Sequence, residues 1–133
     1  MFKKKLTDDS FTNLISEGTR IHGDIIFNGI LKVEGEINAD INCESKEISN
    51  ANSFITTSTS KISGNVLSSP NAIIGGVCNT LSIYVTGTLR ILKTAVINNA
   101  NINYDILEIE TGAILNNCQM IHSKSEDLCE QPE

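Results

Sequence analysis

Apolar residues recur at intervals of 18 positions along most of this chain, and this repeat constrains the fold more than any other feature. A first set steps through Ile30, Ile48, Val66, Tyr84, Ile102 and Met120. A second set steps through Ile37, Ile55, Ile73, Ile91 and Ile109. A third set holds small or turn-forming residues, namely Asp40, Ser58, Gly76, Thr94 and Gly112. Internal periods of this length are typical of solenoid proteins.

Local alternation of apolar and polar residues within each repeat predicts short β-strands with one face turned inward. If each repeat completes one circuit, residues one circuit apart stack about 4.8 Å from each other, which is the spacing between paired strands. The sequence therefore predicts an all-β fold, a parallel β-solenoid with about six coils of about 18 residues over residues 12–122. We expect the two apolar sets to line its interior as vertical ladders.

A left-handed β-helix also uses about 18 residues per coil, but it places an apolar residue at every sixth position. Here the sixth position after Ile37 is Cys43, and one coil further that set reaches Lys61. The sixth position after Ile30 is Glu36, and its set reaches Arg90. Because charged residues interrupt each such frame, we expect a right-handed coil with an irregular, triangular cross-section.

Glycine recurs in short units of the form apolar-x-Gly-x-apolar, at residues 21–25, 33–37, 62–66 and 85–89. Later in the chain the pairs Asn98–Asn99 and Asn116–Asn117 take the place of glycine, again 18 positions apart. Asn is the residue other than glycine that best tolerates a positive φ angle. The exchange therefore predicts tight corners at these asparagines.

Composition excludes several classes of function. The chain has 133 residues, 40% of them hydrophobic, and a formal charge of −6, which disfavours nucleic-acid binding. Its four cysteines form no CxxC pair, so reduced thiols packed as small apolar residues are expected rather than a metal site. The only histidines are His22 and His122, one in each terminal coil. We therefore predict a protein that is not an enzyme, with no catalytic residue, no cofactor and no metal.

The segment from Ile15 to Ile25, followed by the repeated Gly units, resembles the bactofilins over residues 12–121. This resemblance implies a right-handed β-helix that polymerises without nucleotide into non-polar filaments at the cytoplasmic face of the membrane. It also implies a structural role, as a scaffold for cell-wall or morphogenesis proteins. The chain departs from the family pattern in its asparagines and in its number of cysteines, which we expect to affect stability more than function. A non-polymerising β-helical adaptor and an acyltransferase-like enzyme remain the alternatives.

The first and last coils of a solenoid leave strand edges and core side chains uncovered, which favours stacking of a second copy. The candidate contacts between copies are Leu14, Ile15, Ile21, Leu115, Met120 and Ile121. The resemblance implies that a hydrophobic residue of the last coil is important for assembly, and Leu115 matches that position. The alternative is that Leu115 is only a core residue. We expect the homopolymer to join head to head and tail to tail.

Both ends of the chain are predicted to be tails, an N-terminal one over residues 1–11 and an acidic one over residues 123–133. No apolar run is long enough to span a membrane, and Asp8 and Asp9 occupy the place of a signal peptide's apolar stretch. We expect a cytoplasmic protein, peripherally bound to an anionic membrane surface. The candidate lipid contacts are Phe2, Lys3, Lys4, Lys5 and Leu6. The alternative is an ordinary solvated basic terminus.

Overall fold

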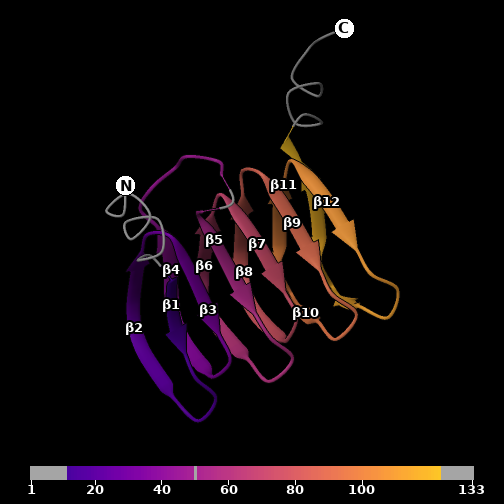
Figure 1. Cartoon of the computed structure of the whole chain (residues 1–133). Helices are drawn as coiled ribbons and strands as arrows, with labels where there is room; N and C mark the ends of the chain where they lie inside the picture. The colour runs from indigo at the N-terminus through magenta and orange to yellow at the C-terminus, as the bar shows by residue number, and fades with distance from the viewer. Residues whose placement is uncertain (1–11, 50, 124–133) are drawn as a thin grey trace, which may run out of the picture.

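The chain winds into a parallel β-solenoid of about six coils, which advance in one direction from the N-terminal to the C-terminal end (Figure 1). The computed structural model describes residues 12–49 and 51–123. Fourteen strands are present in these residues, and each pairs in parallel with strands one coil away. The predicted fold class is therefore confirmed. The first and last coils form the two opposite tips of the rod (Figure 1).

Each coil has three faces. The first face is a sheet of six short strands: β1 (Thr12–Ile15), β3 (Ile30–Val33), β5 (Ser53–Thr56), β7 (Asn71–Ile74), β9 (Thr88–Ile91) and β12 (Ile106–Ile109). The second and third faces share four long strands: β2 (Arg20–Phe27), β4 (Glu36–Cys43), β6 (Lys61–Ser69) and β8 (Val77–Val85). In the last two coils these faces separate into β10 (Val96–Asn98) and β13 (Ile114–Asn116) on the second, and β11 (Asn101–Tyr104) and β14 (Gln119–His122) on the third.

Strand β8 shows how one long strand serves two faces. It pairs with β10 through Val77 and Cys78, and with β11 through Ser82, Ile83 and Tyr84. The strand therefore turns between these two segments. In coils 5 and 6 the same corner is an interruption, where Asn99 and Asn117 have φ angles of 55° and 54°. The prediction of tight corners at these asparagines is confirmed.

Glycine serves the corners of the coils in two ways, and only one of them was expected. Gly23 has a φ of 123°, so it adopts a conformation that other residues avoid. Gly35, Gly64 and Gly87 lack a positive φ, and their requirement is space. A Cβ on Gly35 would lie 2.5 Å from the Ser16 carbonyl oxygen, too close for any other residue to fit without movement.

The coils are not all 18 residues long, which corrects the register expected from the sequence. Arg20 pairs with Glu36, 16 positions on, whereas Glu36 pairs with Lys61, 25 positions on. The long coil contains the loop between β4 and β5, described at residues 44–49 and 51–52. A shift of register between the pairs Asn38–Ser63 and Ile41–Leu67 marks a bulge, with one extra residue in β6. Asn52, buried in the loop, accepts a hydrogen bond from the Gly29 backbone N–H and donates to the Glu47 carbonyl.

Unequal coils break up both apolar sets. In the first set only Ile102 and Met120 pair directly, and Ile48 lies exposed in the loop. In the second set Ile55 pairs with Ile73, and Ile91 with Ile109, while Ile37 belongs to a different ladder. The two sets therefore do not line the interior as single ladders.

The interior is built from three main ladders, two with one inward side chain in every coil and one, on the first face, that begins in coil 2. On the second face the ladder is Ile21, Ile37, Ile62, Cys78, Ile97 and Leu115. On the third face it is Ile25, Ile41, Leu67, Ile83, Ile102 and Met120. On the first face it is Leu31, Phe54, Ala72, Leu89 and Leu107. These side chains are buried in coils 2 to 5, so the core runs the length of the rod.

Candidate assembly surfaces at the two tips

The C-terminal tip presents the open end of this core. Strands β12, β13 and β14 pair only with coil 5 within the described residues. In coil 5, Ile91, Ile97 and Ile102 are all 0% exposed. Their pairing partners in coil 6 are more exposed: Ile109 is 46% exposed, and Leu115 and Met120 are partly exposed. The difference arises because no further rung among the described residues covers the sixth.

Two further isoleucines widen the apolar surface of this tip. Ile106 in β12 is 52% exposed and Ile114 in β13 is 49% exposed. Together with Ile109 they are candidate contacts that our sequence prediction missed as a group. Ile109 follows Ile91 by one coil on the inner side of the first face, so the alternation of Leu107 and Ile109 carried a signal for it, whereas Ile106 pairs with Thr88 on the outer side and had no such signal.

Polar side chains hold the last coil to the one below it. Asn116 Nδ2 donates to Asn98 Oδ1 at 2.8 Å, and Asn117 Nδ2 donates to Asn99 Oδ1 at 2.9 Å. Arg90 Nε lies 3.0 Å from Glu108 Oε1. These contacts link coils 5 and 6 at more than one face. They hold the last coil in a fixed position on coil 5, so the tip has a defined surface.

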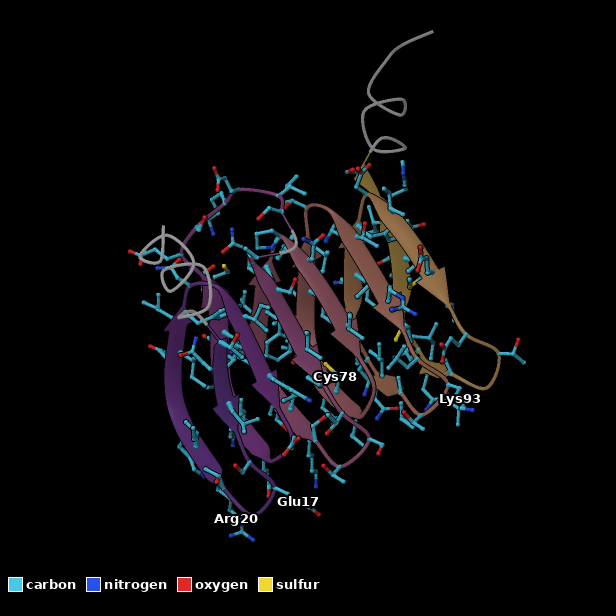
Figure 2. The ribbon with its side chains drawn as sticks, in the orientation of Figure 1. Glu17, Arg20, Cys78 and Lys93 are labelled. Carbon is cyan, nitrogen blue, oxygen red and sulfur yellow. The ribbon has the colours of Figure 1, made fainter. Side chains whose placement is uncertain are left out.

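The N-terminal tip is the second open end. Strands β1 and β2 pair only with coil 2 within the described residues. Ile15, Ile21 and Ile25 point inward on the first rung and are partly exposed, whereas their neighbours on the second rung are buried. Figure 2 shows Glu17 and Arg20 at the turn of this coil between the first and second faces, and Lys93 at the same corner several coils along.

The predicted contact residues therefore occupy three kinds of position. Leu115 and Met120 are the last inward residues of their ladders, at the C-terminal tip. Ile15 and Ile21 are inward residues of the first coil, at the N-terminal tip. Ile121 pairs with Asn103 on the outer side of the third face, and Leu14 pairs with Lys32 on the outer side of the first. The candidate lipid contacts at residues 2–6 lie outside the described residues.

The described residues carry little reactive chemistry. They contain no group of three or more His, Cys, Asp or Glu side chains placed to hold a metal ion. Cys43, Cys78 and Cys118 are free thiols, and burial raises the pKa of Cys78, which keeps that thiol protonated. In Figure 2 Cys78 lies within the coil, on the second-face ladder. Within the same residues, no helix is long and apolar enough to cross a membrane.

Comparison with known proteins identifies the family. The model of the bactofilins, described as polymer-forming cytoskeletal proteins, matches residues 13–119. A search of curated proteins and a search of solved structures each gave no match. The matched region begins in β1 and ends at the first residue of β14, so it includes residues of all six coils. The chain therefore belongs to the bactofilin family of polymer-forming, structural cytoskeletal proteins.

Proposed function

We propose that this protein assembles end to end, through its two tips, into filaments that require no nucleotide. The contacts join C-terminal tip to C-terminal tip and N-terminal tip to N-terminal tip, so the filament is non-polar. The filaments lie at the cytoplasmic face of the membrane and serve as a scaffold for cell-wall or morphogenesis proteins. Membership of a polymer-forming family supports the assembly step.

The observation that carries this proposal is the abrupt change in burial at the last rung. Ile97 is 0% exposed because Leu115 covers it, whereas nothing among the described residues stacks upon Leu115 itself. A second copy placed on the tip buries Leu107, Ile109, Leu115 and Met120 and gives the unpaired strand edges new partners. Because both partners present the same apolar surface, a symmetric contact between identical tips is self-complementary.

The test places a charge in this contact. In Leu115→Arg we expect filaments to disappear from negative-stain micrographs, because an arginine at the centre of the contact leaves a buried, unpaired charge. The matched control is Ile48→Arg, since Ile48 is 60% exposed in the loop between β4 and β5, outside both tips. Circular dichroism should show unchanged β-structure in both variants. Filaments of normal length from Leu115→Arg would refute the end contact.

Attachment to the membrane is proposed for the N-terminal residues Phe2, Lys3, Lys4, Lys5 and Leu6. Each lysine near an anionic leaflet contributes about 1 kcal/mol, and burial of one Phe side chain adds about 1.5–3 kcal/mol at most. One copy therefore binds weakly. A filament that carries many copies binds far more tightly through multivalency, so assembly and attachment are coupled.

A further inference from the structure

The N-terminal tip is less complete than the C-terminal tip. At the C-terminal tip each of the three interior ladders ends in an apolar residue, namely Leu107, Leu115 or Met120. At the N-terminal tip the inward position that pairs with Leu31 on the first face is held by Asn13. Asn13 is exposed, and its Nδ2 donates to the backbone carbonyls of Asn28 and Ile30, both at 3.3 Å. Within the described residues, one apolar rung is therefore missing from this tip.

A groove of about 440 Å³ lies at the missing rung. Among the residues that line it, β1 contributes Asn13 and Ile15, β2 contributes Ile25 and Phe27, and coil 2 contributes Leu31. Ile15 and Ile25 are partly exposed, whereas Phe27 and Leu31 are buried. Pockets of roughly 300–1,000 Å³ hold drug-sized ligands, so this groove has room for large apolar side chains.

The chain that precedes the groove has the composition to fill it. Residues 1–11 join β1 at Thr12, directly before Asn13, so this segment starts at the edge of the groove. It contains three large apolar residues, Phe2, Leu6 and Phe11. An extended segment of this length reaches about 40 Å at most, so each of the three can return to the groove. Because the segment is tethered there, its effective concentration is on the order of millimolar, and even a weak contact is populated.

The charges around the groove also favour this segment. Asn28 lines the groove, and its Nδ2 donates to the exposed Glu44 carboxylate at 3.1 Å. Asp24, also in β2, is exposed as well. The lysines at positions 3–5 lie between Phe2 and Leu6 in the sequence and complement these carboxylates. A second copy is a poorer occupant, because two identical grooves set face to face leave each other unfilled.

We propose that residues 1–11 fold back onto the N-terminal tip of their own chain and place their apolar side chains in this groove. A docked segment covers Ile15 and Ile25, so it blocks the N-terminal junction of the filament; this consequence rests on the end-to-end assembly proposed above. If about nine molecules in ten hold the segment docked, the concentration needed for that junction rises about tenfold. Phe2 and Leu6 are also the proposed lipid contacts. Since a side chain cannot lie in the groove and in a bilayer at once, an anionic membrane frees the tip.

Fluorine NMR of the full chain labelled with 4-fluorophenylalanine tests the docking, below the concentration at which filaments form. The chain has four Phe residues, and a Phe→Leu variant of each assigns its resonance. We expect the resonance of Phe2, of Phe11 or of both to differ from that in a free peptide of residues 1–11. Peptide-like resonances for both residues in wild type would overturn the proposal.

Two variants show whether the groove is the docking site. Asn13→Leu supplies the missing apolar rung and fills the groove, so we expect the shifted resonance to return to its peptide value. The matched control is Leu81→Ser, since Leu81 is 54% exposed in β8, outside the groove, and this variant should keep the wild-type spectrum. A shifted resonance that persists in Asn13→Leu would overturn the assignment to this groove.

Sedimentation measures the effect on assembly. The triple variant Phe2→Ser, Leu6→Ser, Phe11→Ser lacks the docking side chains and leaves β1 unchanged. In the absence of lipid, we expect it to assemble at a concentration about tenfold lower than wild type. Equal critical concentrations would overturn the block of the junction. If neither protein forms filaments, end-to-end assembly fails and the block falls with it, while the fluorine spectra still decide the docking.

Discussion

Leu115 and Ile97 occupy successive rungs of one ladder, so truncating each to alanine separates folding from assembly. Ile97 is fully buried within the chain, and we expect Ile97→Ala to lower the free energy of unfolding by about 2–5 kcal/mol. Leu115 is only partly buried, because no described residue stacks on the side of it that faces away from Ile97. Part of the burial of Leu115 is therefore completed only when another copy stacks on it.

The magnitude for Leu115 follows from its carbon atoms. Leucine to alanine removes three carbons, worth about 0.8 kcal/mol each when fully buried, or about 2.4 kcal/mol in all. If folding of the single chain provides somewhat more than half of this burial free energy, about 1 kcal/mol per chain comes from the contact between tips. We therefore expect Leu115→Ala to raise the critical concentration for assembly about fivefold, at about 1.4 kcal/mol per factor of ten.

Two measurements on the same preparations complete this experiment. Denaturant unfolding at low protein concentration reports the stability of the single chain, and sedimentation reports the concentration left unassembled. We expect Ile97→Ala to be the more destabilised variant and Leu115→Ala to be the one with the larger assembly defect. An unchanged critical concentration in Leu115→Ala, with a loss of stability like that of Ile97→Ala, would show that Leu115 is only a core residue.

Three further predictions follow from single features. Asp40 Oδ1 accepts from the backbone N–H groups of Asn65 (2.9 Å) and Val66 (3.3 Å), so Asp40→Ala should cost about 1–3 kcal/mol in urea unfolding, against little for Asp24→Ala on the neighbouring strand. Equal effects would contradict this role. Burial raises the pKa of Cys78 from 9.0, so the folded state holds that proton more tightly than the unfolded state and stability should fall as pH rises past about 9. In Cys78→Ala the free energy of unfolding should therefore change less with pH in that range than in wild type. Equal slopes in the two proteins would contradict this role of Cys78. Removal of residues 2–6 should abolish co-sedimentation with anionic vesicles while filaments persist, and a truncated protein that still pellets with vesicles would exclude this segment as the lipid contact.

The fold could be predicted because a solenoid repeats its strand pattern even where its coils differ in length. The residues that stack in each interior ladder could not be predicted. Ile48 falls at an interval of 18 from Ile30, but it lies in the loop between β4 and β5, outside the strands, and Ile30 pairs with Ser53 instead. The spacing of apolar residues in the sequence does not reveal a loop of this length. The corners at Asn99 and Asn117 were predictable, because the tolerance of Asn for positive φ is a property of the residue itself.

The candidate contacts were predictable to a similar degree. Leu115 and Met120 follow from the rule that the last coil of a solenoid lacks a cover. Ile106 does not, because it pairs with Thr88 on the outer side of the first face, so no apolar ladder leads to it. The row of Asn79, Asn98 and Asn116 also required the structure, since these residues align only under the true register, with steps of 19 and 18 positions.

The account depends on the claim that the open rungs at the tips are the surfaces that assembly covers. Hydrogen–deuterium exchange of wild-type protein, below and above its critical concentration, tests this most directly. We predict that assembly slows amide exchange in β12, β13 and β14 and in β1 and β2, with little change in β5 and β7 at the middle of the rod. Slowed exchange confined to the middle coils, with the tip strands unchanged, would contradict the account.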